Sequence, residues 1–300
     1  MDPATLREMQ SLAQEVWRLA PETVDADGTV GEMAWGEGQR TGEPDRPHRL
    51  WRDGSQLAGW GVIFPPEQVR VTEERMEQRE AMLAWQVHPE RVGLLDDVLE
   101  WFARETPGAK RLTFVRAGYA TARARIEARG YRHDPGGEFD LMNIRDLNEI
   151  EEPSLPPGYR LSTMAEVADV SRRVEVHRAA WEPSRLTEER YRAVMATWPY
   201  RADLDVVVVA PDGTLASSAI GWYDEAERTG EFEPVGTHPA HRRRGLARAV
   251  LLFGMQRLRE AGATHAVIGA RGDDDYPAPR LVYGSVGFRE LSRNMPFVQG

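Results

Sequence analysis

The 300-residue chain contains no cysteine. Disulfide bonds, thiolate nucleophiles and cysteine-ligated metal sites are therefore excluded, and any group transfer must use another nucleophile or none. Lysine is nearly absent too, because Lys110 is the only one and almost all positive charge lies on guanidinium groups. With 38 basic and 48 acidic residues the formal net charge is -10, and such a field repels nucleic acid and anionic membranes. A neutral or cationic small-molecule partner suits this charge better.

Long apolar runs are also missing. The segments "DVVVVA" (205–210) and "VLLFGM" (250–255) are far too short to cross a bilayer. The first twenty residues are charged and periodic, which is typical of a surface helix, and they lack the basic start and apolar centre of a signal peptide. We therefore expect a cytoplasmic protein with no membrane partner.

The two halves of the chain repeat one order of features. "WRDGSQLAGWGVIF" and "APDGTLASSAIGWYD" each read as a strand, an Asp-Gly turn and a second strand. "MLAWQVHPE" and "FEPVGTHPA" each read as a strand that stops at His-Pro, and an amphipathic helix and a short buried strand follow both. The pattern predicts two α/β domains, 1–150 and 151–300, joined by the acidic, proline-rich "DLNEIEEPSLPPGYRL".

An anion-binding turn is predicted in the second half, where three arginines and Gly245 stand directly before a long helix. The first amides of a helix have no partner within it, and the helix dipole makes this end positive. A glycine lets a ligand approach the backbone, and arginine side chains add charge-assisted bonds. Phosphate is the most natural ligand of such a turn.

The second half resembles the GNAT superfamily of acetyltransferases between Tyr159 and Leu291. The family pattern Q/R-x-x-G-x-G/A is met by "RRRGLA", and the pattern L-Y-x-x-x-G-F by "VYGSVGF". The resemblance implies two tandem GNAT-like domains, each a mixed, mostly antiparallel sheet flanked by helices, with acetyl-CoA as co-substrate. It implies that the pantetheine arm and the pyrophosphate are bound by Val235, Gly236, Thr237, Arg242, Arg243, Arg244, Gly245, Leu246 and Ala247. One departure is "YPAP" at 276–279, where many relatives carry N-x-x-A.

The first half resembles the same fold less closely. Glu90 stands three positions before Gly93, where the family has an arginine or glutamine, and Asp96 and Asp97 place negative charge at the helix start. Their repulsion opposes a pyrophosphate. Ile126 stands where the second half has a tyrosine. We interpret residues 1–150 as a degenerate GNAT-like domain and residues 151–300 as the catalytic one.

Three residues are candidates for proton transfer. Alternation along the strand places Glu231 and Glu233 on one face, and counting back from Gly245 places Glu231 where some GNAT enzymes carry a general base. Each of the two is either the base or a solvated strand carboxylate. Tyr283 aligns with the family tyrosine that faces the thioester sulfur, so the resemblance implies a proton donor. For His238 we expect a structural role, because His88-Pro89 repeats its His-Pro pair in the half without the other site residues.

Aromatic residues are frequent in the second half. Trp181, Trp222 and Tyr223 are either core residues or candidates for lining the pocket of an acceptor amine that has an apolar body. "GDDDY" reads as a solvated loop, so no metal is expected. The resemblance implies an N-acetyltransferase acting on a small-molecule amine, as a monomer or a homodimer. Two alternatives stay open: a non-catalytic protein that binds CoA or acyl-CoA, and an acyltransferase with another acyl donor or a hydroxyl acceptor.

The lack of cysteine predicts the kinetic order of such a reaction. With no thiol to carry the acyl group, acetyl should pass directly from donor to acceptor in a ternary complex. Initial rates measured at several fixed concentrations of acceptor should give double-reciprocal lines that intersect. Parallel lines, or an acetylated protein that turns over, would contradict direct transfer.

Overall fold

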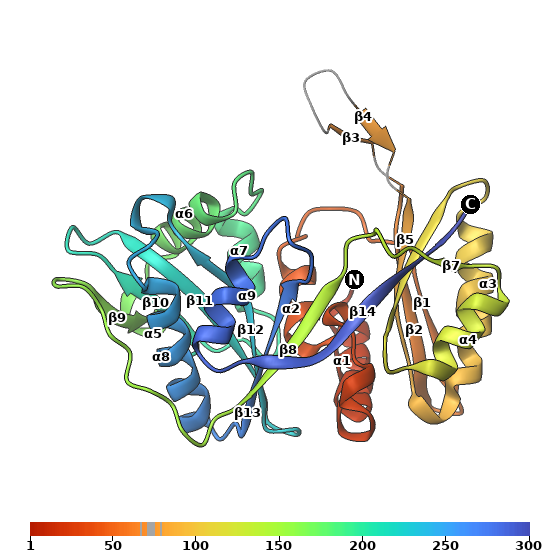
Figure 1. The fold of residues 1–300 in the computed structure, drawn as a ribbon, viewed down its shortest axis with the longest axis horizontal. Helices are drawn as coiled ribbons and strands as arrows, with labels where there is room; N and C mark the ends of the chain where they lie inside the picture. The colour runs from red at the N-terminus through yellow and green to blue at the C-terminus, as the bar shows by residue number, and fades with distance from the viewer. Residues whose placement is uncertain (67, 71–75, 79) are drawn as a thin grey trace. The chain divides into compact units, whose positions relative to one another are not determined.

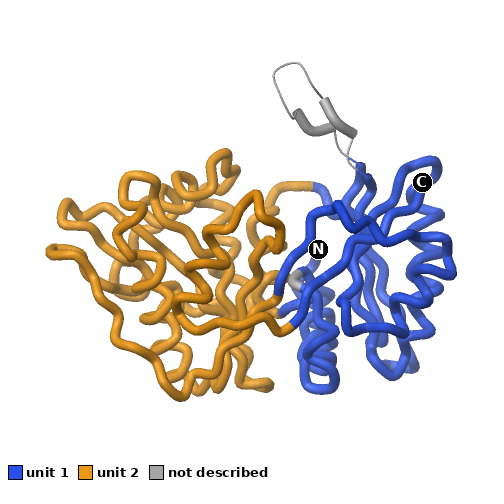
Figure 2. Tube along the Cα trace, viewed as in Figure 1, with its two compact units in different colours: residues 1–29, 44–141, 292–300 blue, residues 30–43, 142–291 orange. Residues whose placement is uncertain are grey.

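The computed structural model describes residues 1–66, 68–70, 76–78 and 80–300, and the chain forms two compact units (Figure 2). Unit 1 consists of residues 1–29, 44–141 and 292–300, and unit 2 of residues 30–43 and 142–291. The sequence predicted a single boundary near residue 150. The structure differs because a helix from the first half is buried in unit 2 and the last strand of the chain is paired in unit 1.

Unit 1 contains a mixed sheet with the strand order β1-β2-β5-β6-β14, and β7 also pairs with β14. Only β5 and β6 are parallel; the other pairings are antiparallel. The elements are α1 (Pro3–Leu19), η1 (Pro21–Thr23), η2 (Ala26–Gly28), β1 (His48–Asp53), β2 (Gln56–Phe64), β3 (Gln68–Arg70), β4 (Met76–Gln78), β5 (Ala81–Val87), η3 (Pro89–Leu94), α3 (Leu95–Glu105), β6 (Arg111–Arg116), α4 (Ala120–Ala128), β7 (Arg132–His133) and the end of β14 (Arg289–Gln299).

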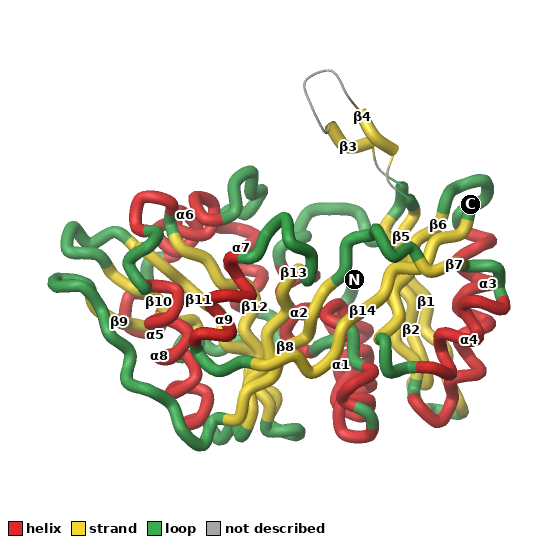
Figure 3. Tube along the Cα trace, viewed as in Figure 1, coloured by secondary structure: helices red, strands yellow, loops and turns green. Residues whose placement is uncertain are grey.

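Helices cover both faces of this sheet (Figures 1 and 3). On one face, Trp101 of α3 and Ile126 of α4 pack in a core that includes Trp51 and Phe297. On the other face α1 packs against β2. Asp2 accepts hydrogen bonds from the first amides of α1 and so caps the helix, which explains why the charged, periodic N-terminus begins a helix at Pro3. The helix–strand order expected for this half is confirmed.

Unit 2 has the strand order β8-β13-β12-β11-β10-β9, in which β12 and β13 are parallel. Its elements are α2 (Val30–Gly38), β8 (Asp140–Asp146), β9 (Arg160–Thr163), α5 (Met164–Val167), α6 (Val170–Ala180), α7 (Glu188–Met195), β10 (Asp205–Val209), β11 (Leu215–Asp224), β12 (Thr229–Thr237), η4 (Pro239–His241), α8 (Leu246–Ala261), β13 (His265–Arg271), α9 (Ala278–Ser285) and the start of β14. The expected linker between β8 and β9 has no helix or strand, and Leu155 and Tyr159 in it pack against the core of this unit.

Two apolar cores lie on opposite faces of this sheet. The valines of β10 alternate between them: Val206 and Val208 join the core under α8, whereas Val207 packs with residues of α5 and α6. Beside that second core, α2, α6 and α7 pack against the central strand β11. A buried ion pair of 2.9 Å between Arg173 of α6 and Asp205 of β10 joins helix and sheet.

A buried arginine in unit 1 lies among carboxyl groups. The Nε atom of Arg116 donates to the Val24 carbonyl over 2.8 Å, and its Nη2 lies 3.4 Å from the Asp25 carboxylate. Burial, and then repulsion from Asp25, raise the pKa of Asp27 to about 7 and that of Asp140 to about 6. The folded protein therefore disfavours the charged forms of both groups.

This cluster predicts a pH-dependent gain in stability for Asp27→Asn. The folded pKa of about 7 lies above the ordinary value of 3.8, so the cost of ionising Asp27 is complete above pH 7 and absent below pH 3.8. We expect the variant to raise Tm by roughly 2–6 °C at pH 8, and the gain to shrink as the pH falls towards 4. Thermal unfolding of both proteins across this range measures it, and an equal gain at every pH would contradict the assignment.

Candidate active site

The parallel strands β12 and β13 of unit 2 diverge. Their pairing runs from Thr229↔His265 to Glu231↔Val267 and stops there, although β12 continues to Thr237. Over this last stretch β12 still pairs with β11 on its other side. The backbone groups of one edge of β12 therefore face the opening between the strands, where an extended ligand can use them.

A bulge in β12 lies at the point of divergence. Phe232 is opposite Gly221 and Val235 is opposite Ala219, so Glu233 and Pro234 together face one residue of β11. The indole Nε1 of Trp222 donates to the Glu233 carbonyl over 2.6 Å and so connects a side chain of β11 to the bulge. The bulge thus fixes the position of the backbone from which the Glu233 side chain projects.

The turn before α8 has an unusual backbone. Arg243 has φ 62° and Gly245 has φ 77°, both in the left-handed region, and Gly245 caps the helix without a side-chain hydrogen bond. A Cβ placed on Gly245 would meet no atom of the described chain within 4 Å, so the space beside the turn is open. Arg242, Arg243 and Arg244 are exposed here. The backbone amides of a turn of this kind can bind an anion.

Arg242 has a second role that its position in the sequence motif did not indicate. Its Nε donates to the Thr237 carbonyl and its Nη2 to the Ala180 carbonyl, each over 3.3 Å. The side chain therefore connects the end of α6 to the end of β12. Arg243 and Arg244 remain the exposed cations beside the turn.

Tyr283 lies on α9, half-buried against the core of unit 2, with its ring 6.3 Å from that of Phe288. Burial and then the charge of Glu233 raise the pKa of Tyr283 well above its ordinary value. The hydroxyl therefore stays protonated at physiological pH, as a proton donor requires. Both predicted residues belong to unit 2, and the charge of Glu233 acts on the Tyr283 hydroxyl.

Glu231, the other predicted carboxylate, is differently engaged. Its Oε2 accepts a hydrogen bond of 2.9 Å from the amide of Gly31, in the first turn of α2. His238 has the structural role that we expected: its Nδ1 accepts from the Ala240 amide over 3.1 Å, as His88 does from Glu90 in unit 1.

The structure separates the three predicted acceptor-lining residues. Trp181 is 46% exposed and lies against Gly236 of β12, since a Cβ on that glycine would be 3.0 Å from the indole Nε1. Trp222 is buried against Gly31. Tyr223 points to the opposite face of β11, in the core under α8, because neighbours along a strand alternate.

Sequence reasoning missed two rings on the same side as Trp181. His177 of α6 stacks on Trp181 at 6.3 Å, and Trp35 of α2 lies 5.2 Å from His177. Burial and then the positive charge of Arg173 lower the pKa of His177 to about 3, so the imidazole is neutral at physiological pH. No local signal connects Trp35 to this site, because it lies in the first half of the sequence.

The corresponding region of unit 1 is filled. There β5 and β6 pair from Ala81↔Arg111 to Leu83↔Thr113 and then diverge, but the Trp85 indole donates to Thr113 Oγ1 and to the Phe114 carbonyl and so connects the two strands. The pairing of β5 with β2 has no bulge.

The helix start of unit 1 differs as well. Gly93 lies inside the 3-10 turn η3 that leads into α3, and a Cβ on it would be 3.6 Å from a guanidinium nitrogen of Arg125. That arginine is paired with Asp96. The amides of this turn are therefore not arranged as they are before α8.

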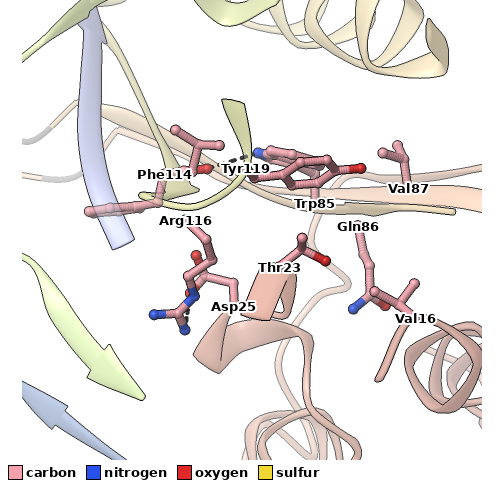
Figure 4. A pocket seen from close by; sticks show the side chains of 10 residues that line it. Val16, Thr23, Asp25, Trp85, Gln86, Val87, Phe114, Arg116 and Tyr119 are labelled. Atoms are coloured by element: carbon pink, nitrogen blue, oxygen red, sulfur yellow. Dashed lines mark hydrogen bonds and ion pairs between the residues drawn. The ribbon is translucent and has the colours of Figure 1, made fainter. Parts of the chain in front are cut away.

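A small pocket remains beside Trp85 in unit 1. Figure 4 shows the rings of Tyr119 and Trp85 along one side of it and the side chains of Arg116 and Asp25 below them. The Tyr119 hydroxyl is buried without a hydrogen-bond partner, and burial raises its pKa to about 12.

The sequence predicted no metal site and no membrane partner. The findings on both concern only the residues that the structure describes. No group of acidic and histidine side chains among them is arranged to hold a metal ion, and in the "GDDDY" loop Asp273 is paired with Arg271 and Asp274 with Arg280. None of the helices in the described ranges has the length and apolar character to span a membrane. The cytoplasmic location stays a prediction.

Comparison with known proteins relates this chain to a family of acetyltransferases. Residues 172–288 match the model of the acetyltransferase (GNAT) family. A mycothiol acetyltransferase of Kineococcus radiotolerans is 28% identical over 204 residues, which are 67% of this chain and 61% of the relative, so the match covers less than two thirds of that protein.

Solved structures show the same fold. A GCN5-related N-acetyltransferase from Sphaerobacter thermophilus aligns with a TM-score of 0.63 at 18% identity, over 100% of this chain and 93% of the other. A tandem GNAT protein from the clavulanic acid biosynthesis pathway aligns with a TM-score of 0.59 at 15% identity, over 99% and 95%. The predicted fold class of two tandem GNAT-like domains is confirmed.

Proposed function

Residues 172–288 are a GNAT acetyltransferase domain, and from that premise we propose that the protein is an acetyl-CoA-dependent N-acetyltransferase whose reaction takes place in unit 2. The main support is the contrast between the two diverging strand pairs. In unit 2 the strands β12 and β13 open beside the bulge that carries Glu233, and Tyr283 lies on α9, which packs against β13 and α8. In unit 1 an indole bridges the corresponding opening. The acetyl transfer named for the curated relative agrees with this proposal.

The binding of acetyl-CoA follows from the two open backbone surfaces. The turn of 242–247 would hold the pyrophosphate through its amides, with Arg243 and Arg244 adding charge. The edge of β12 at 235–237 would pair with the amides of the pantetheine arm. The bulge interrupts this edge of β12 at Glu233. The thioester would lie beside that residue.

In the proposed reaction a carboxylate of β12, Glu233 or Glu231, accepts a proton from the acceptor amine, directly or through water. The amine nitrogen then forms a bond to the thioester carbonyl carbon, and the carbon–sulfur bond breaks. Tyr283 gives its hydroxyl proton to the departing thiolate, and the second proton of the nitrogen then restores the Tyr283 hydroxyl, directly or through water. The products are the amide and the CoA thiol, and the carboxylate releases its proton to solvent. The carboxylates also favour an amine that arrives as a cation, in keeping with the negative charge of the whole protein.

The acceptor is proposed as a small molecule that carries its amine on an apolar body. Trp181, partly exposed beside β12, is the support for this class, whereas Trp222 is buried and its indole holds the bulge. Tyr223 is withdrawn from the acceptor-lining set, because its side chain is in the core under α8.

The first prediction from this proposal is one acetyl-CoA per chain. Calorimetric titration should give a stoichiometry of about one, because the amides before α8 are available and those at Gly93 lie in a closed 3-10 turn. Gly245→Glu should abolish binding by placing a carboxylate in the anion site, whereas the matched Gly93→Glu should leave it unchanged. Two equivalent sites, or binding lost in the Gly93 variant, would contradict the assignment to unit 2.

The second prediction separates an enzyme from a protein that only binds CoA. Tyr283→Phe keeps the ring against Phe288 and removes the proton donor, so kcat should fall by roughly 10–10³ while the Kd of acetyl-CoA changes little. Steady-state kinetics and calorimetry measure the two quantities. A kcat within twofold of the parent across acceptors and pH would make Tyr283 a packing residue, and no turnover by the parent with a broad panel of amines would favour the binding protein.

A further inference from the structure

Glu231 connects two parts of the chain that are 200 positions apart. Its carboxylate accepts the hydrogen bond from the amide of Gly31, the second residue of α2. The first amides of a helix lack partners within it, and the dipole at this end favours a negative charge. Glu231 therefore acts on α2 as a capping carboxylate does, although it comes from a strand of the second half of the chain.

Gly31 lies in close contact with the site. A Cβ at this position would lie 2.4 Å from Oε2 of Glu231 and 2.6 Å from Cγ and Cδ1 of the Trp222 indole. Both distances are below any contact that a methyl group tolerates. The first turn of α2 therefore lies directly on the two side chains, and only glycine permits that approach.

The same indole holds the candidate base. Trp222 donates its Nε1 proton to the Glu233 carbonyl at the bulge. A shift of the indole would therefore move the backbone from which the Glu233 side chain projects. Contacts thus lead from Gly31 through Trp222 to Glu233.

The rest of segment 30–43 is fixed to unit 2 by further contacts. A Cβ on Gly38 would be 2.7 Å from the Cα of Val194, so the end of α2 lies against α7. Glu43 pairs with Arg190 of α7 over 2.8 Å. Trp35 packs in the apolar cluster that contains Trp222. The segment is joined at both ends to unit 1 along the chain, yet all of these contacts lie inside unit 2.

We infer that segment 30–43 is a positioning element of the acyl-transfer site. In this arrangement Glu231 is a positioning residue that fastens α2, and Glu233 is the base. A base must present a carboxylate oxygen to the acceptor amine, whereas Oε2 of Glu231 already accepts the hydrogen bond of the Gly31 amide. The inference rests on the proposed function for its kinetic tests and on the contacts of α2 for its structural test.

The first test uses two glycines of the same helix. Gly31→Ala should lower kcat by about 10–100-fold, because the added methyl displaces Trp222 and with it Glu233. The Kd of acetyl-CoA should stay within about twofold, since the turn before α8 is not involved. Gly36→Ala is the matched control: its Cβ would meet nothing closer than Glu32 at 3.8 Å, so kcat should be unchanged. Equal kcat values for the Gly31 variant and the parent would overturn the inference.

The second test distinguishes positioning from base catalysis at Glu231. Gln keeps an oxygen that accepts the Gly31 amide, so Glu231→Gln should retain kcat within about threefold and keep the acidic limb of the pH–rate profile. Glu231→Ala should lower kcat about tenfold with the limb still present. Glu233→Gln should remove the limb and cost roughly 10²–10⁴ in rate. Loss of the limb in Glu231→Gln would make Glu231 the base and overturn the assignment.

The third test needs no activity. Amide hydrogen exchange of peptides covering residues 30–38 should be faster in full-length Glu231→Ala than in the parent, because the start of α2 loses its acceptor. Peptides from α8 should be unaffected. Unchanged exchange in 30–38 would disprove the docking even in an active enzyme. An inactive parent with faster exchange in the variant would instead reject the proposed function and leave the docking of α2 established.

Discussion

The divergence of β12 and β13 is the constraint on which the rest of unit 2 depends. A pair of parallel strands that separates leaves backbone donors and acceptors without partners, and burying them unpaired is costly. Unit 2 meets this constraint on one side through the bulge at Glu233 and the Trp222 indole that satisfies its carbonyl. On the other side the edge of β12 remains for a ligand. The divergence of the two strands therefore accounts for the bulge and, in the proposed function, for the binding of the pantetheine arm.

The two units show how local residues decide what a shared architecture can do. Both contain a parallel pair that opens beside the start of a helix. In unit 1 the Trp85 indole bridges the two strands across the opening, and a 3-10 turn beside Arg125 closes the start of the helix. In unit 2 left-handed backbone at Arg243 and Gly245 opens the turn. The difference is a matter of a few side chains and two φ angles, and it fits the interpretation of unit 1 as a degenerate copy.

Segment 30–43 gives the first half of the chain a further part in this arrangement. Unit 2 is not a continuous stretch of sequence, because one helix on the face of its sheet away from α8 comes from the N-terminal half. The apolar side of α2 is covered there, and Gly31 and Gly38 allow backbone contacts that larger residues would prevent. A duplicated chain can thus retain its first domain for structural reasons even where that domain has no chemistry of its own.

The sequence by itself determined the repeated order of strands and helices, the glycine turn before α8 and the helical position of Tyr283. Each of these depends on periodicity, turn residues or spacing within about fifty positions, which a linear pattern records. Only the tertiary structure decided that Tyr223 points away from Trp222, that Glu231 is bonded to Gly31, and that segments 30–43 and 292–300 lie in the other half's unit. These features depend on contacts between residues far apart in the chain, where no local propensity selects the partner.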